Sequence, residues 1–186
     1  MRRVVIFLVC ICILFPLGCD YTPRPLPPIE VHFSPEGGCT ETVVREIEAA
    51  QSSILIQAFS FTSVPIAKAV VEAYKRGVHV EVILDRSQKT EKYSMADYLH
   101  NSLVPLLIDS EHAIAHNKIM IIDGQVVITG SFNFTNQAEH SNAENLLVIR
   151  DKILADQYTV NWKLHAEHSQ EYAGKVKQDR EYDFQE

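Results

Sequence analysis

Hydrophobic and polar positions along the chain follow two periods, one typical of β-strands and one typical of α-helices. Short apolar runs rich in Val and Ile, and strict two-residue alternation, predict strands, whereas apolar residues three and four apart predict amphipathic helices. Strands are predicted at residues 29–33, 54–59, 78–84, 106–108, 119–122, 126–129 and 146–149. Helices are predicted at residues 40–50, 65–76, 95–103 and 152–168.

This alternation of strands and helices predicts an α/β fold, with a mixed, mainly parallel sheet flanked by helices on both faces. The chain has 186 residues, enough for one core but not for two, and it contains no internal repeat. We therefore expect a single domain over residues 29–168, followed by a polar tail over residues 169–186.

The first 19 residues resemble a bacterial secretion signal rather than part of the fold. Arg2 and Arg3 precede an apolar run, residues 4–14, that is too short for a comfortable membrane span of about 20 residues. The run leads into Leu17-Gly18-Cys19, which is similar to a lipobox whose cysteine is lipidated, although Pro16 stands where Leu is usual. An uncleaved signal anchor is the alternative. Lipidation or an anchor would hold the domain on the periplasmic side of the envelope membrane, and secretion is the further alternative.

Residues 20–28 contain four prolines, which predicts a stiff, extended tether between the membrane and the domain. Of the four cysteines, only Cys39 lies within the predicted domain. No disulfide is therefore expected inside it, and the hydrophobic core must supply the stability.

The runs 119–122 and 126–129 flank Asp123-Gly124, a pair that predicts a tight hairpin because such turns need positive φ. If the loop has two residues, Ile122 faces Gln125 and His116 lies opposite Ser131. The hairpin would then place side chains from both strands together at its open end.

The residues at that open end suit a bound phosphate. His116 and Lys118 share one strand face, because side chains alternate along a strand. Lys118 offers a positive charge, while Ser131, Asn133 and a protonated His116 offer hydrogen-bond donors. A histidine can also act as nucleophile or general acid near neutral pH.

The compound pattern carries a family resemblance. His116-x-Lys118-(x4)-Asp123, followed by Gly130-Ser131-x-Asn133, resembles the signature motif of the phospholipase D superfamily. The chain is most similar to the small single-motif bacterial endonucleases of that superfamily, over roughly residues 29–162.

This resemblance implies roles for individual residues. His116 would be the covalent nucleophile, Lys118, Ser131 and Asn133 would hold the phosphate, and Glu144 would orient His116. Asp123 and Gly130 would support the site, and Asp123 is also expected to accept hydrogen bonds from nearby backbone amides. No cofactor and no catalytic metal are implied.

A single motif per chain predicts a homodimer. The nucleophile and the acid that protonates the leaving group must act on opposite faces of phosphorus, so one His116 cannot do both in the same step. Two chains related by a two-fold axis would supply both histidines.

Charge bears on the substrate. The formal charge is −7, and removal of Arg2 and Arg3 leaves 15 basic and 24 acidic residues, or −9. An acidic protein is unusual among nucleic-acid binders, which mostly carry a basic field. Local cations in the loop after residue 84 are candidate substrate contacts: Arg86, Lys89 and Lys92.

The function predicted first is a non-specific, metal-independent endonuclease cleaving DNA or RNA through a phosphohistidine. The alternative is a phospholipase D-type hydrolase of membrane phospholipids, and a third hypothesis is a non-catalytic nucleic-acid-binding lipoprotein. Asp85, Asp123 and Glu144 would make only a weak metal site. The chain shows no Cys/His spacing of a zinc site, and we expect His165 and His168 to lie on a solvated helix face.

Overall fold

The computed structural model describes residues 25–175. The predicted secretion signal with Cys19, most of the proline-rich tether and residues 176–186 lie outside this range. The strands are β1 (Ile29–Ser34), β2 (Ser53–Ala58), β3 (His79–Asp85), β4 (Leu106–Asp109), β5 (Lys118–Ile122), β6 (Val126–Gly130), β7 (Glu144–Arg150) and β8 (Gln170–Glu171). The helices are α1 (Cys39–Ala49), α2 (Val64–Lys75), α3 (Ala96–Asn101), α4 (Asn136–His140) and α5 (Lys152–His168), with a 3-10 helix at Arg86–Lys89.

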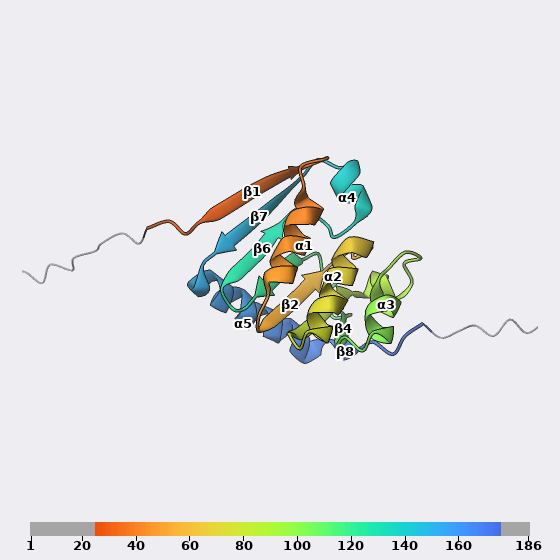
Figure 1. The fold of residues 1–186 in the computed structure, drawn as a ribbon. Helices are drawn as coiled ribbons and strands as arrows, with labels where there is room; N and C mark the ends of the chain where they lie inside the picture. Colours follow the sequence, from red (N-terminus) through yellow and green to blue (C-terminus); the bar gives the residue numbers. More distant parts are fainter. Residues whose placement is uncertain (1–24, 176–186) are drawn as a thin grey trace, which may run out of the picture.

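The eight strands form one sheet in the order β1-β7-β6-β5-β2-β3-β4-β8 (Figure 1). Only β2–β3 and β3–β4 pair in parallel, and the other five neighbouring pairs are antiparallel. The prediction of a mainly parallel sheet is therefore wrong. Helical crossovers join β2, β3 and β4, but β5, β6 and β7 follow one another without a long crossover, so each strand reverses direction.

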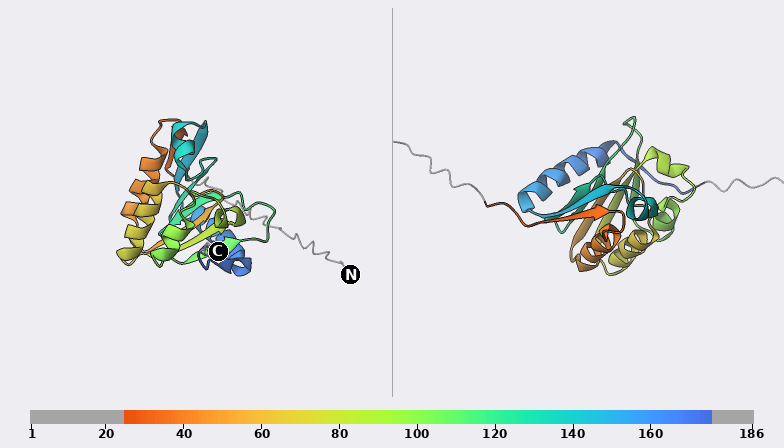
Figure 2. Two further views of the ribbon diagram at one scale, coloured as in Figure 1. Left: turned by 90° about the vertical axis from the view of Figure 1, so that its right-hand side faces the viewer. Right: turned by 90° about the horizontal axis from the view of Figure 1, so that it is seen from above.

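Helices cover both faces of the sheet, as predicted (Figure 2). Helices α1, α2 and α3 enclose the larger core, to which every second residue of each central strand contributes, for example Ile54, Ile56 and Met120. Helix α5 covers the opposite face over a smaller core that includes Ile121 and Trp162. The indole of Trp162 donates a hydrogen bond to the carbonyl oxygen of Ile56 at 2.9 Å, which ties α5 to the central strand β2.

The β5–β6 hairpin forms where predicted, but its register differs by one residue. Asp123 and Gly124 both have positive φ, 53° and 61°, and Ile122 pairs with Val126 rather than with Gln125. Gln125 is the third loop residue, and its amide donates to the Ile122 carbonyl at 3.0 Å.

This corrected register changes which residues face each other across the hairpin. Met120 lies opposite Ile128, and the same register continued sets Asn117, not His116, opposite Ser131.

The ordered chain continues beyond the boundary predicted at residue 168. Strand β8 pairs with β4, and the amide of Tyr172 donates to the Leu106 carbonyl at 2.9 Å. The Tyr172 ring is buried, and its hydroxyl donates to Asp97 at 2.7 Å. Part of the predicted polar tail therefore belongs to the domain.

The last turn of α5 also differs from prediction. His165 and His168 do not simply face solvent, because a ring nitrogen of each lies 2.9 Å and 3.4 Å from the buried carboxylate of Asp109. Sequence spacing could not reveal this contact, since Asp109 is more than 50 residues away along the chain.

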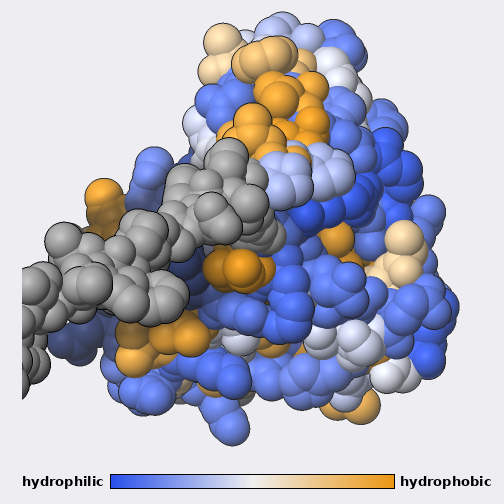
Figure 3. Space-filling model, turned by 90° about the vertical axis from the view of Figure 1, so that its left-hand side faces the viewer, coloured by the Kyte–Doolittle hydropathy of each residue, from blue (hydrophilic) through white to orange (hydrophobic). Residues whose placement is uncertain are grey.

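The edge strand β1 carries an apolar stripe. Ile29, Val31 and Phe33 are 48%, 49% and 64% exposed, and the view from the side of β1 shows apolar surface there (Figure 3). Within residues 25–175, no helix is long and apolar enough to cross a membrane.

Candidate active site

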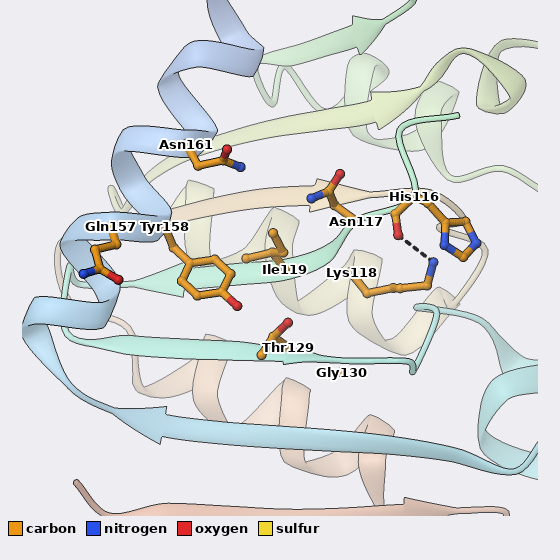
Figure 4. A pocket seen from close by; sticks show the side chains of 9 residues that line it. All are labelled: His116, Asn117, Lys118, Ile119, Thr129, Gly130, Gln157, Tyr158 and Asn161. Carbon is orange, nitrogen blue, oxygen red and sulfur yellow. Dashed lines mark hydrogen bonds between the residues drawn. The ribbon is translucent and has the colours of Figure 1, made fainter. Parts of the chain in front are cut away.

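His116 and Lys118 lie together where β5 begins. Lys118 is the first residue of β5 and is 7% exposed, on the face that carries Met120 into the larger core. Its ammonium donates a hydrogen bond to the His116 carbonyl oxygen at 2.8 Å (Figure 4). The predicted nucleophile and the predicted phosphate-binding cation are thus direct neighbours.

Phe59, directly after β2, packs against both residues. Its ring centroid lies 4.6 Å from that of the His116 imidazole, and the Lys118 ammonium lies 5.0 Å from the Phe59 centroid. The Phe59 amide donates to the Asn117 carbonyl at 2.8 Å, which holds the two strand ends together. The motif analysis missed Phe59, although its place at the end of a buried strand was the available signal.

Burial lowers the pKa of Lys118, and the negative charge of Glu144 partly opposes this shift. Glu144 is the first residue of β7, and its carboxylate accepts a hydrogen bond from the Asn142 side chain at 3.0 Å. The Lys118 ammonium is therefore partly desolvated and within the electrostatic influence of the carboxylate predicted to orient His116.

Gly130 and Ser131 connect the hairpin to β7. A Cβ on Gly130 would lie 2.2 Å from the Asn145 carbonyl oxygen, and φ is 144°, so only glycine fits without displacing β7. The Ser131 hydroxyl accepts hydrogen bonds from the Asn145 amide at 3.0 Å and from its side chain at 3.2 Å. The structure thus ties Ser131 to β7.

Asn133 contributes a buried polar atom without a partner. Its side-chain oxygen makes no hydrogen bond, and the residue lines a pocket that also includes Phe59 and Asn142. A buried acceptor without a partner is costly, so this oxygen is available to a hydrogen-bond donor.

A larger pocket of about 370 Å³ opens beside His116 and Lys118. Figure 4 shows these two residues at one end and side chains from α5 at the other. Gln157, Tyr158 and Asn161 of α5 line that end, with Asn117, Ile119, Thr129 and Gly130 also in the lining. Sequence analysis missed the α5 residues, because no local pattern showed which helix face meets β5.

The three candidate cations after β3 are placed differently from one another. The Arg86 guanidinium donates to the Ala113 carbonyl at 3.0 Å and so supports the loop before His116. Lys89 and Lys92 line a separate pocket near Tyr172. The Lys92 ammonium lies 5.1 Å from the ring centroid of Tyr93, a residue that lines the pocket of Asn133.

The acidic residues considered as a metal site are engaged separately. Asp123 accepts hydrogen bonds from the backbone amides of Gln51, Ser52 and Ser53 at 2.7 to 3.0 Å. Asp85 accepts from the amides of Ser87 and Ala115, each at 2.8 Å. Asp123 thus has the structural role predicted for it, and within residues 25–175 these carboxylates do not form a metal-ligand group with Glu144.

Comparisons with known proteins agree with the motif. Residues 43–164 match the family model described as "Cardiolipin synthase, PLD-like domain". The chain is 45% identical over 130 residues to a protein of Rickettsia prowazekii named phospholipase D, covering 70% of this chain and 63% of that protein. It is 30% identical over 148 residues to the mitochondrial cardiolipin hydrolase of Xenopus laevis, covering 74% and 70%. The match therefore spans less than two thirds of the length of the rickettsial relative.

Solved structures show the same fold. The crystal structure of Nuc from Salmonella typhimurium, a phospholipase D family member, has a TM-score of 0.75 and 40% identity, covering 78% of this chain and 98% of that one. NucT from Helicobacter pylori has a TM-score of 0.69 at 22% identity, with 78% of this chain and 100% of that one covered, which shows a common fold.

Proposed function

This chain belongs to the phospholipase D superfamily, and from that premise we propose that it is a metal-independent phosphodiesterase that cleaves nucleic acid, with DNA as its first substrate. The observation that carries this proposal is the position of His116 and Lys118 at the end of a pocket that continues along α5. A proposed nucleophile, a cation and a pocket lined by polar side chains then lie next to one another.

The proposed reaction needs two chains. A ring nitrogen of His116 attacks phosphorus and forms a P–N bond, while the partner subunit's His116, protonated, donates its proton to the leaving alkoxide as the P–O bond breaks. Water then attacks phosphorus, gives a proton to the now neutral partner subunit's His116, and breaks the P–N bond. Both histidines return to their starting protonation states.

Lys118 would neutralise the phosphate in this reaction. Its ammonium is nearly buried, so its attraction for an anion is screened less than that of a surface lysine. The two Lys118 side chains of a dimer would supply the positive charge that a metal supplies in many other phosphodiesterases.

The chemistry of the pocket favours nucleic acid over lipid. Asn117, Gln157 and Asn161 offer amide groups, and Tyr158 offers an aromatic ring with a hydroxyl. Amides hydrogen-bond to sugars, phosphates and base edges, and aromatic rings can stack on exposed bases. For acyl chains, Ile119 is the one aliphatic side chain among the lining residues.

The second candidate is hydrolysis of phospholipid headgroups. It is favoured by the 45% identity to the rickettsial protein named phospholipase D and by the predicted membrane signal at the N-terminus. The same histidine chemistry would serve both substrates, so the two candidates differ only in what the pocket binds.

Purified full-length protein in mild detergent should be assayed with excess chelator on plasmid DNA, RNA and phospholipid vesicles side by side. We expect DNA to be nicked by the wild type, and His116→Asn to lower the rate about a thousandfold or more. His79→Asn is the matched control, because His79 is an exposed residue at the start of β3. Turnover of phospholipid with intact DNA would assign the second candidate, and undiminished activity in His116→Asn would refute the proposed mechanism.

A further inference from the structure

Three histidines and one aspartate converge at the end of β4, outside the pocket of His116. Asp109 is the last residue of β4 and is fully buried. His112 lies in the following loop, and His165 and His168 lie in the last turn of α5. One ligand atom from each of the four residues lies within 4.8 Å of the others.

All three imidazoles point at the same carboxylate oxygen. From Asp109 Oδ2, the distances are 3.1 Å to His112 Nδ1, 2.9 Å to His165 Nδ1 and 3.4 Å to His168 Nε2. A tetrahedral zinc ion with bonds of about 2.0–2.1 Å sets its ligand atoms about 3.3–3.4 Å apart. The three oxygen–nitrogen distances are therefore close to those that such an ion requires, and all four ligand atoms lie within 4.8 Å of one another.

The Asp109 carboxylate is oriented for this role by its other oxygen. Oδ1 accepts the backbone amide of Glu111 at 3.1 Å and lies 3.3 Å from His112 Nδ1, while Oδ2 faces all three imidazoles. A carboxylate oxygen, like an imidazole nitrogen, is an ordinary zinc ligand.

We propose that Asp109, His112, His165 and His168 bind one divalent transition-metal ion, with zinc as the ion that this ligand set fits best. Imidazole nitrogens favour zinc and its neighbours over magnesium and calcium, which prefer all-oxygen sites. Four protein ligands complete a tetrahedron and leave no position for substrate. The site is therefore structural and takes no part in the proposed phosphodiester chemistry.

The ion would join two segments that shape the pocket. His112 lies four residues before His116, in the loop that Arg86 also holds through the Ala113 carbonyl. Helix α5 carries Gln157, Tyr158 and Asn161 on the pocket wall. A metal bound between this loop and the end of α5 would fix the distance between the two sides of the pocket.

Metal binding should be measured on the full-length protein in detergent after treatment with chelator and removal of that chelator. Calorimetric titration with Zn²⁺ should give one ion per chain, and Co²⁺ in its place should give the strong visible absorption of a tetrahedral site. The double variant His165→Gln/His168→Gln should bind Zn²⁺ more than about a hundredfold more weakly, since its amides are poor zinc ligands. Zn²⁺ should raise the melting temperature of the wild type and not that of the double variant.

Two single variants serve as controls that test where the ion binds. His79→Gln removes an exposed imidazole that pairs with Glu81, and His116→Asn removes the proposed nucleophile. Both variants should bind Zn²⁺ like the wild type. Loss of binding in His116→Asn would place the metal in the active site and overturn the proposal. Absence of stoichiometric binding in the wild type, or equal binding by the double variant, would show that the four residues form only an ion-pair cluster. These binding results do not depend on whether the protein cleaves DNA.

Discussion

At the scale of single residues, Asp123 holds the hairpin turn to the start of β2. Its carboxylate accepts hydrogen bonds from the amides of Gln51, Ser52 and Ser53 and from the Ser52 hydroxyl at 2.7 to 3.0 Å. Burial raises the pKa of Asp123, but these hydrogen bonds outweigh burial and leave the pKa below its usual value. The hydrogen bonds therefore stabilise the fold more strongly when the carboxylate is charged than when it is protonated.

We expect Asp123→Asn to lower the free energy of unfolding by about 2 kcal/mol at pH 7, since bonds to a charged acceptor are replaced by weaker neutral ones. Asn still tolerates the positive φ of this position, so the backbone itself is not strained. Urea denaturation measures the change.

The pH dependence of that difference follows from the depressed pKa of Asp123. The stabilisation is fully present above the unfolded pKa of about 3.9 and is lost as the pH falls through the folded pKa. The gap between wild type and Asp123→Asn should therefore close as the medium is acidified below about pH 4. A gap that stayed constant down to the lowest accessible pH would show that charge is not what matters at this position.

The candidate residues of the motif were the part of the site that the sequence predicted best. His116, Lys118, Ser131 and Asn133 lie within one hairpin and the turn after it, so spacing alone indicated them. Residues brought in from elsewhere could not be found in this way. Phe59, Asn161 and Asp109 contact or lie beside residues that are distant in sequence. These contacts depend on how the strands and α5 pack against one another.

At the scale of elements, β8 and the residue after it close the sheet at the edge of β4. The Tyr172 hydroxyl donates to Asp97 at 2.7 Å, and burial together with this carboxylate raises the pKa of Tyr172 to about 12. Together with the amide of Lys175, which donates to Asp97 at 3.1 Å, this side chain joins the segment after β8 to α3.

Tyr172→Phe should lower the free energy of unfolding by about 1.5 kcal/mol, because it removes a hydrogen bond to a charged acceptor and leaves the ring in place. Tyr172→Ala should cost about 3–5 kcal/mol, since it also empties a buried position. Tyr98→Phe, at a more exposed tyrosine of α3, is the control and should change little. Equal stability of Tyr172→Phe and wild type in urea would mean that the hydroxyl is equally well satisfied by water.

The bounds of most helices and strands could be predicted from the sequence. The directions of the strands could not, because they depend on which strands pair. Helix α5 spans the predicted residues, Lys152–His168, and Asp151 caps its first turn. The direction of β5, β6 and β7 depends on connection length and on the pairing of β1 with β7, neither of which leaves a periodic signal. Strand β8 has only two residues, too few for any pattern.

At the scale of the whole molecule, the proposed chemistry requires two chains around one phosphate. Refolding the wild type from urea together with an equal amount of His116→Asn should form mixed pairs at random. If each site needs both histidines, only about a quarter of the pairs are fully active, and activity should fall to about a quarter of that of an equal total of wild-type chains.

A chain that worked alone would keep half of the activity in the same mixture. Refolding with His79→Asn in place of His116→Asn is the control, because that partner chain is expected to be competent. The nicking rate of plasmid DNA distinguishes the two outcomes, and an activity near one half would exclude a site shared between subunits.

Strand β1 is the outer edge of the sheet, and the prolines at positions 27 and 28 stand directly before it. An open edge with exposed Val31 and Phe33 invites a strand from another molecule to add to it. Proline has no amide hydrogen to give such an incoming strand, so the ladder cannot lengthen towards the N-terminus. Pro27 and Pro28 thus confine strand addition to the edge of β1 itself, and a shortened protein starting at Ile29 would lose that restriction.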